Sequence, residues 1–333
     1  MSEPRMESLR LKDNESLAVC VPSHGRPELV SKALSALANS MRRLDRQPSV
    51  LVLINGPMNY ASQVEATFID KFDDLSVVHD EVPGLARARN VALELVTTDW
   101  LAFLDDDAIP DESWVPEALK AIQRRPGVIA IGGPYFRTLE PGFRQPRWLP
   151  IGYGTWDQGH RECVVETVPG GNMIIHRQSA LALGGFREEF GMRGDARLWG
   201  EESELQRRAK EHGLLTIYVP TLRISHLLHG DRLSFRGALI EEWQRGLQAH
   251  AVKRWNNSFS LILGSVYSFG RALGFALILP VRVIVAPLLG RKMIAEACHC
   301  LLSALNRSGQ AIGSLREIEL LRKTERARVP PVE

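Results

Sequence analysis

The chain has 333 residues, 44% of them hydrophobic and 24% charged, which is enough apolar sequence for one large core or a core with an appendage. None of its four cysteines forms a CxxC pair, and the N-terminus contains no apolar run, so neither a disulfide scaffold nor a secretory signal is expected. Residues 231–333 carry 15 Lys and Arg against 8 Asp and Glu, whereas the preceding residues carry 26 against 31. This basic last part predicts an anionic neighbour, either a membrane or a nucleic acid.

The first hundred residues alternate between short apolar runs and segments of helical period. Strands are predicted at LAVCVP (17–22), SVLVLI (49–54), LSVVHD (75–80) and WLAFLD (100–105). We expect Cys20 to be a small core residue of the first strand. Because the strands are continuously apolar and alternate with helices, the pattern is typical of a mainly parallel sheet with helices on both faces, which binds ligands at the carboxyl ends of its strands.

One helix is predicted from Pro27 to Leu44, because proline occupies the first turn and apolar residues recur at helical spacing. Residues 132–156 are rich in Gly, Pro and Trp and predict an irregular, ordered loop over a site. Further along the chain we expect two strands within 163–176, helices at 177–185 and 200–213, a strand at 214–220, and a closing segment at 223–230.

The predicted domains are an N-terminal extension (1–16), a catalytic domain (17–230) and a C-terminal helical region (231–333). Apolar blocks after Phe259 are broken by arginines and prolines, and an Arg near the middle of a spanning helix costs roughly 3 kcal/mol. These blocks therefore favour an interfacial helical hairpin on an anionic leaflet, with no nucleic-acid partner; the basic residues that would reach the headgroups are Lys253, Arg254, Arg291 and Lys292. The alternative is a helical cap on the catalytic domain or a homodimer interface.

Three adjacent carboxylates, Asp105, Asp106 and Asp107, follow the fourth predicted strand, and nothing basic stands near them in the sequence. They form either a solvated loop or a cation site. Since side chains alternate along a strand, Asp105 and Asp107 point to the same side, a spacing that suits Mg²⁺ or Mn²⁺ bound to a diphosphate. The segment DDAIPD also looks like the aspartate-rich box of prenyl-diphosphate enzymes, but that box belongs on a long helix, and here Pro110 interrupts it.

Five motifs, in order, carry a resemblance to a known family: VPSHGRPELVSKAL, VPGLARARNVALE, WLAFLDDDAIPDESW, GGNMIIHRQSALALGGF and GEESEL. The set, spanning about Leu17 to His226, resembles the family 2 glycosyltransferases, which are inverting enzymes of GT-A fold. The resemblance implies a nucleotide-sugar donor, Mn²⁺ or Mg²⁺ as cofactor, and an acceptor hydroxyl that attacks the anomeric carbon.

The resemblance also implies roles for residues. Those expected to bind the nucleotide sugar are Pro22, Ser23, Arg26, Asn55, Arg89, Asn90, Asp105 and Asp106. Those expected at the metal are Asp105, Asp107 and His226, with His229 as a rival to the histidine. Those expected near the sugar and acceptor are Gly170, Gly171, Asn172, Trp199 and Glu201. One departure concerns the nucleobase, because Ile54 stands where the family usually has an Asp that reads it.

The acids of GEESEL supply the expected catalytic base. In the family this element reads Glu-Asp with the second acid as base, which corresponds to Glu202 here. The alternative is favourable charge in the first turn of a helix, worth about 0.5 kcal/mol.

The predicted function is an inverting, metal-dependent sugar transfer to a glycan or lipid-linked acceptor, in cell-surface polysaccharide biosynthesis on the cytoplasmic face of the membrane. Two alternatives remain. A sugar-nucleotide nucleotidyltransferase would be expected to carry a Gly-rich, Lys-containing phosphate loop after the first strand, and VPSHGRPELV differs from that pattern. A non-catalytic scaffold of GT-A fold would not be expected to keep a costly cluster of carboxylates.

Overall fold

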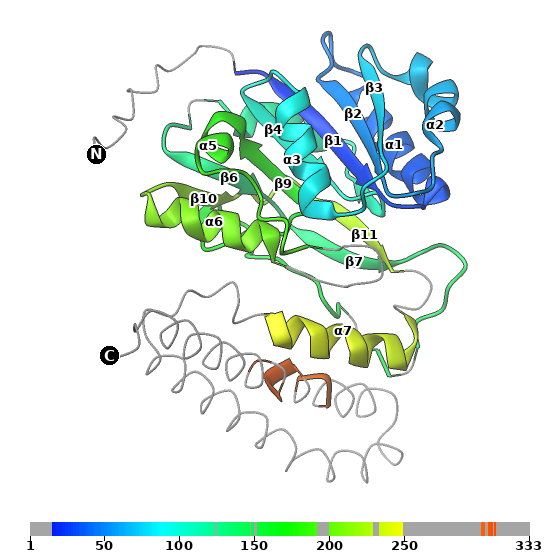
Figure 1. Cartoon of the computed structure of the whole chain (residues 1–333), viewed down its shortest axis with the longest axis vertical. Coiled ribbons are helices and arrows are strands. Elements are labelled where there is room, and N and C mark those ends of the chain that lie inside the picture. Colours follow the sequence, from blue (N-terminus) through cyan, green and yellow to red (C-terminus); the bar gives the residue numbers. More distant parts are fainter. Residues whose placement is uncertain are drawn as a thin grey trace, which may run out of the picture. The chain divides into compact units, whose positions relative to one another are not determined.

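The structure is a computed structural model that describes residues 15–123, 125–146, 148–149, 152–191, 200–228, 233–248, 301–303, 306–308 and 310. Strands and helices alternate along the first part of the chain (Figure 1). The strands are β1 (Leu17–Ser23), β2 (Ser49–Asn55), β3 (Leu75–Asp80), β4 (Trp100–Leu104), β5 (Ala108–Pro110), β6 (Val128–Gly132), β7 (Tyr135–Leu139), β8 (Cys163–Val165), β9 (Asn172–His176), β10 (Leu215–Tyr218) and β11 (Ile224–Leu228). The helices are α1 (Pro27–Met41), α2 (Ala61–Phe68), the 3₁₀ turn η1 (Ile69–Lys71), α3 (Leu85–Leu95), α4 (Trp114–Ala121), α5 (Arg177–Ala182), α6 (Glu201–Glu211) and α7 (Phe235–Gln248).

Eight strands form one sheet in the order β3-β2-β1-β4-β9-β6-β10-β8. The pairs among β3, β2, β1 and β4 are parallel, as is the pair of β6 and β10. β9 runs antiparallel to both β4 and β6, and β8 runs antiparallel to β10. The fold is therefore a mixed sheet that is mainly parallel, and the predicted fold class is confirmed.

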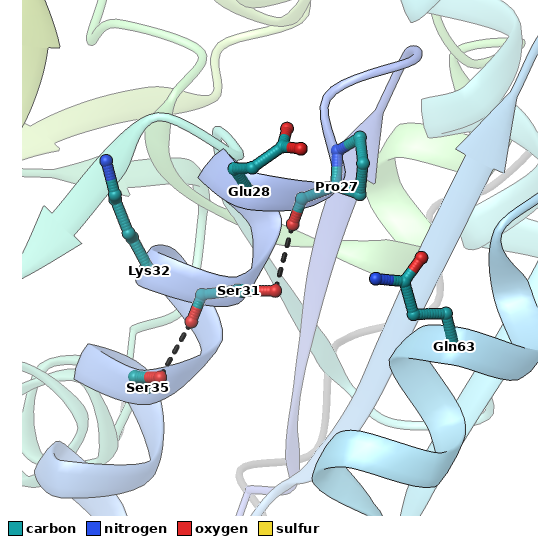
Figure 2. Close-up of a pocket in the computed structure, with 6 residues that line it drawn as sticks. All are labelled: Pro27, Glu28, Ser31, Lys32, Ser35 and Gln63. Carbon is teal, nitrogen blue, oxygen red and sulfur yellow. Dashed lines mark hydrogen bonds between the residues drawn. The ribbon is translucent and has the colours of Figure 1, made fainter.

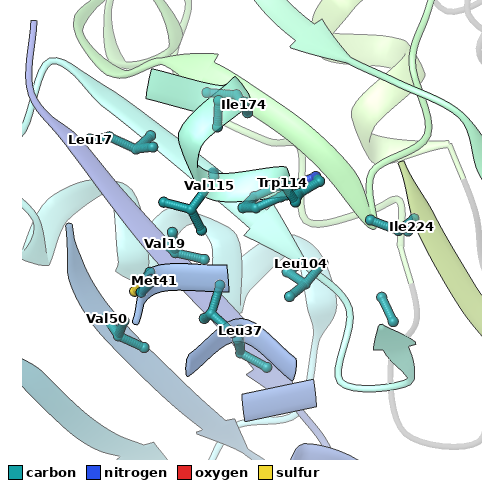
Figure 3. Packing of buried hydrophobic residues seen from close by; sticks show 14 of the residues in the cluster. Leu17, Val19, Leu37, Met41, Val50, Leu104, Trp114, Val115, Ile174 and Ile224 are labelled. Atoms are coloured by element: carbon teal, nitrogen blue, oxygen red, sulfur yellow. The ribbon is translucent and has the colours of Figure 1, made fainter. Parts of the chain in front are cut away.

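Helices cover both faces of this sheet. On one face α1, α2 and α4 pack on alternate strand residues such as Val19 and Val50, and Figure 3 shows Leu37 and Met41 of α1 and Trp114 of α4 in that layer. On the other face α3, α5 and α6 pack on the intervening residues, among them Cys20, which is fully buried as expected. Because both faces are covered, consecutive strand residues are buried, which accounts for the continuous apolar runs.

A second sheet of three strands, in the order β5-β11-β7, follows the aspartate triplet. Its strand β7 lies inside residues 132–156, so the prediction that this stretch contains no regular element is wrong. All five residues of β7 are only half-buried and include Arg137 and Thr138, so no apolar run marks the strand. The predicted helix from Pro27 ends at Met41, three residues before Leu44.

The chain divides into two compact units. Unit 1 comprises Met1–Phe136, Thr155–Gly194 and Glu201–Leu227, and unit 2 comprises Arg137–Gly154, Asp195–Gly200 and Leu228–Glu333. Within unit 2, Arg137 pairs with Glu241 of α7 at 3.0 Å, and the hydroxyl of Tyr153 donates to Glu242.

Most of the predicted C-terminal region, including its four flanking basic residues, lies outside the described residues. Among the residues that the structure does describe, no helix is long and apolar enough to cross a bilayer.

Candidate active site

The aspartate triplet lies at the carboxyl end of β4, as expected, and the small sheet brings a histidine beside it. β5 pairs antiparallel with β11, which sets Ala108 opposite His226. His226 Nε2 lies 2.7 Å from the Asp107 carboxylate and 3.8 Å from that of Asp105. One ligand atom from each of these three residues falls within 4.8 Å of the others.

These three side chains fit a divalent cation. Two carboxylate oxygens and an imidazole nitrogen are donors that Mn²⁺ and Mg²⁺ sites use. Asp107 and His226 are buried, whereas the Asp105 side chain is 25% exposed, which leaves an open side for a ligand. A Cβ on Gly171 would collide with the Asp105 carboxylate, so glycine leaves this carboxylate room.

The middle carboxylate of the triplet has different neighbours. Asp106 is fully buried and accepts a 2.5 Å hydrogen bond from the Ser23 hydroxyl, which in turn accepts one of 2.6 Å from Tyr60. The guanidinium of Arg26 pairs with Asp106 through Nε, at 3.1 Å, and through Nη2, and its Nη1 lies 3.1 Å from Asp107. Burial raises the pKa of Asp106 to about 7 although Arg26 opposes the shift.

Arg26 is itself held in its charged form. Burial alone lowers the pKa of its guanidinium, but the charges of Asp106, Asp107 and Asp105 outweigh burial and raise it. The Arg26 side chain is 35% exposed, so it reaches solvent as well as the triplet. The first loop therefore offers a fixed positive charge beside the candidate metal site.

The acids of GEESEL open α6, where the positive end of the helix favours negative charge. Glu201 is buried and accepts a hydrogen bond from Arg89 Nη1, and Arg89 Nη2 lies 3.8 Å from Asp105. Glu202 is half-buried. Burial, followed by the neighbouring charge of Glu201, raises the pKa of Glu202 to about 8, whereas Arg89 lowers it.

The side-chain amides of two asparagines predicted at the site, Asn90 and Asn172, are hydrogen-bonded to other residues of the protein. Asn90 donates to the carbonyl of Phe186 at 2.8 Å and accepts from the nitrogen of the same residue at 2.8 Å. Asn172, which is fully buried, accepts from Trp114 Nε1 at 2.9 Å and donates to the carbonyls of Leu222 and Pro134 at 2.7 and 3.2 Å. Both amides therefore connect segments of the fold.

The remaining predicted residues lie at strand ends or outside the described chain. Pro22 and Ser23 are the last two residues of β1, and Asn55 ends β2, where its carbonyl lies 2.6 Å from His24 Nδ1. Gly170 and Gly171 precede β9, and the Asp105 nitrogen donates to the carbonyl of Gly171 at 3.4 Å. Trp199 and His229 lie outside the residues that the structure describes.

Tyr60 belongs to this network but was missed by the sequence interpretation. It lies in the loop between β2 and α2, and its only sequence signal is an aromatic residue in a polar loop. The contact with Ser23, 37 residues away, depends on the fold alone.

A groove of about 590 Å³ lies between α1 and α2 and contains none of the predicted site residues (Figure 2). Its hydroxyls serve the helix backbone: Ser31 donates to the carbonyl of Pro27 at 2.9 Å, and Ser35 donates to that of Ser31 at 2.7 Å. The groove is also lined by the charged side chains of Glu28 and Lys32 and by the amide of Gln63.

Comparisons with known proteins identify the family of this chain. The family model for glycosyl transferase family 2 matches residues 18–184. The chain is 27% identical over 241 residues to the glucosyl-dolichyl phosphate glucuronosyltransferase of Haloferax volcanii, covering 69% of this chain and 74% of that protein. It is 28% identical over 296 residues to the pre-mycofactocin glycosyltransferase of Mycobacterium tuberculosis, covering 84% of this chain and 59% of that protein.

Among solved structures, the mannosyltransferase PcManGT of Pyrobaculum calidifontis, in complex with GDP-Man and Mn²⁺, matches with a TM-score of 0.57 at 16% identity. The match covers 91% of this chain and 88% of that one. The mainly parallel sheet covered by helices is that of the GT-A class of glycosyltransferases. Within that class the chain belongs to glycosyltransferase family 2, and the prediction of a glycosyltransferase is confirmed.

Proposed function

We propose that the enzyme is an inverting, metal-dependent glycosyltransferase that moves a sugar from a nucleoside-diphosphate donor to an acceptor hydroxyl. The observation that carries this proposal is that the site contains two distinct sets of acidic side chains. Asp105, Asp107 and His226 gather donors for a cation, whereas Glu202 stands on α6 with a raised pKa. An inverting transfer needs this separation, because the base and the group that stabilises the departing diphosphate act on opposite sides of the reacting carbon.

In this reaction Glu202 removes the proton of the acceptor hydroxyl as its oxygen attacks the anomeric carbon. The new bond joins the acceptor oxygen to that carbon, and the bond between the carbon and the diphosphate breaks, so a nucleoside diphosphate leaves. A cation held by Asp105, Asp107 and His226 would offset the negative charge that develops on the diphosphate.

The donor nucleotide would lie along the ends of β1 and β2, near Pro22, Ser23 and Asn55. Arg26 supplies a positive charge for the phosphates while Asp106 fixes its position. Ile54 is fully buried in the core, so the nucleobase is read by other groups.

The acceptor that we propose is a glycan or a lipid-linked sugar of a cell-surface polysaccharide. The name of the Haloferax volcanii relative supports this choice, since it states a sugar carried on dolichyl phosphate. The basic C-terminal region, by its composition, would hold the enzyme on the cytoplasmic surface of an anionic membrane. Transfer to a lipid-linked substrate would then occur in the plane of the headgroups.

Thermal melts with Mn²⁺ and a panel of nucleotide sugars test the catalytic proposal, with donor hydrolysis as a second readout. We expect stabilisation by one donor that EDTA abolishes, and a loss of that stabilisation in Asp107→Asn while the metal-free fold stays intact. No stabilisation by any donor would favour a non-catalytic scaffold. Release of pyrophosphate from a nucleoside triphosphate and a sugar phosphate would identify a nucleotidyltransferase instead.

Flotation of the full-length protein with vesicles tests the membrane proposal. We expect flotation with vesicles containing phosphatidylglycerol, weaker flotation with pure phosphatidylcholine, and a loss in the double variant Lys253→Glu, Arg254→Glu. A wild-type chain that stays free of anionic vesicles would contradict membrane association without affecting the catalytic proposal.

A further inference from the structure

The guanidinium of Arg89 is enclosed by protein. The residue is 1% exposed, and its Cζ lies 5.5 Å from the ring centre of Phe103 and 5.6 Å from that of Phe186. A Cβ on Gly170 would lie only 2.6 Å from Nη2, so the glycine leaves space for the guanidinium itself. A nucleotide therefore has little access to Arg89, in contrast to the nucleotide-binding role expected from the sequence.

The acidic partners of Arg89 come from two different parts of the site. Nη1 donates to Glu201 in the first turn of α6, and Nη2 lies 3.8 Å from Asp105 at the candidate metal site. The pKa of Arg89 is raised even though burial opposes it, because Glu201, Asp105 and Glu202 all attract its charge. The buried guanidinium of Arg89 therefore lies next to both Asp105, at the candidate metal site, and Glu201, on the helix that carries the proposed base.

Helix α6 is also anchored to the fold by contacts that do not involve Arg89. Gln206 bonds the nitrogen and the carbonyl of Val168 at 2.8 and 3.1 Å. Arg208 donates to the carbonyls of Leu183 and Gly185 and pairs with Glu204. Arg89, by contrast, leaves its buried Nε without a hydrogen-bond partner among the described residues, and a buried ion pair is in general weak support for stability.

We propose that Arg89 is a positioning residue that couples the metal carboxylate Asp105 to the first turn of α6. This inference rests on the proposed metal-dependent transfer. A cation that binds Asp105 reduces the attraction between Asp105 and Arg89, which leaves the guanidinium to Glu201 and fixes the turn beside Glu202. Because such coupling is reciprocal, the state of α6 also affects metal binding.

The proposal predicts opposite effects on two measurements. Arg89 is a positive charge close to the metal site, so its removal in Arg89→Met should strengthen Mn²⁺ binding about threefold to tenfold. The same variant loses the contact with Glu201, so turnover at saturating Mn²⁺ should fall at least ~10-fold. A purely structural loss would weaken both quantities.

The experiment measures Mn²⁺ binding to the metal-free, full-length chain by electron paramagnetic resonance, together with donor hydrolysis and melting temperature. Arg89→Lys keeps the charge but cannot bridge both acids, so Mn²⁺ binding should stay within about twofold of wild type while turnover falls. Affinity for UDP and GDP at saturating Mn²⁺ should stay unchanged in both variants. Arg208→Lys is the matched control on α6, and it should lower the melting temperature without changing Mn²⁺ binding.

A nucleoside diphosphate affinity that falls in step with turnover would make Arg89 a nucleotide contact and overturn the proposal. Losses of Mn²⁺ binding and turnover in the Arg89 variants that only scale with their fall in melting temperature would overturn it as well. If Arg89→Met does not fold, the proposal is tested with Arg89→Lys and Glu201→Gln. Both variants should bind Mn²⁺ and show slow turnover of the donor. A wild-type chain that binds neither Mn²⁺ nor a nucleoside diphosphate would instead refute the proposed function.

Discussion

The carboxylate of Asp106 accepts a 2.5 Å hydrogen bond from the hydroxyl of Ser23, which places the middle residue of the aspartate triplet against the end of β1. Asp105 and Asp107 gather with His226, whereas Asp106 is buried with Ser23 and Arg26. The three residues lie in the turn between β4 and β5, and Arg26 contacts Asp107 as well as Asp106. We therefore expect Asp105 and Asp107 to serve a cation, and Asp106 to be the main anchor of Arg26, which also contacts Asp107.

Replacing Asp106, which holds Arg26, should lower the affinity for the nucleotide more than the affinity for the metal. In Asp106→Asn the side chain cannot pair with the charge of Arg26, so we expect affinity for a nucleoside diphosphate to fall at least ~10-fold at saturating Mn²⁺. Mn²⁺ binding to the apoprotein, measured by calorimetry, should fall far less than in Asp107→Asn. Tyr60→Phe is the control, because it keeps Asp106 and removes only the outer hydroxyl. An equal loss of Mn²⁺ binding in both aspartate variants would show that Asp106 is a metal ligand.

Gly171 should be required for the metal site. An alanine at this position places its Cβ against the Asp105 carboxylate, which must then move, and we expect Mn²⁺ affinity to fall at least ~10-fold. Gly184→Ala is the control: its φ of +83° strains alanine, but nothing lies within 4 Å of the added Cβ. That control should lose about 1 kcal/mol of stability and keep its metal affinity. Unchanged Mn²⁺ binding in Gly171→Ala would contradict this account.

We expect Asn172 to contribute to the stability of the fold rather than to acceptor binding. Its amide makes three hydrogen bonds to buried groups, so Asn172→Ala should lower the free energy of unfolding by about 3 kcal/mol, measured with urea. Trp114→Phe, which removes only one of the donors, should cost less. If Asn172→Ala unfolds like wild type but loses transfer, the residue contacts the sugar after all.

The sequence predicted the fold well because its signals are local. Continuous apolar runs, such as residues 17–22 and 49–54, indicate strands covered on both faces, and the acids after Leu104 then fall at a ligand-binding edge. Strand β7 was missed because its half-buried residues pair with a strand almost 90 residues later and show no pattern of their own.

The residues that offset the negative charge of the aspartate triplet could not be predicted from the sequence. No basic residue lies near it in the sequence, and yet Arg26 reaches Asp106 from 80 residues away. Arg89 similarly joins Glu201 across 112 residues. A motif indicates which residues act, whereas the partner that neutralises each one depends on the tertiary fold. For the same reason the resemblance placed Arg89 at the nucleotide, although its side chain is buried beside a pair of phenylalanine rings.

The raised pKa of Glu202 should make stability depend on pH. The unfolded glutamic acid ionises near its ordinary pKa of 4.5, whereas in the fold burial holds the proton until about pH 8. Between these values the folded state binds more protons than the unfolded state, so this group lowers the free energy of unfolding as pH rises through that window. Urea melts in EDTA should show a smaller loss between pH 5 and 8 in Glu202→Gln than in wild type, and equal slopes would contradict the shift.

The same group should govern the rate of transfer. As the proposed base, Glu202 acts only when it is ionised, so donor turnover at saturating Mn²⁺ should rise with pH along a limb well above the ordinary pKa of 4.5. Glu202→Gln should keep donor and metal binding but lose at least ~100-fold in rate, and the limb should vanish with it. Glu204→Gln is the control on the same helix, because Glu204 is engaged by Arg208 and stands outside the proposed machinery. If Glu202→Gln transfers normally while Glu201→Gln or Glu204→Gln is inactive, the base is a different acid of this turn.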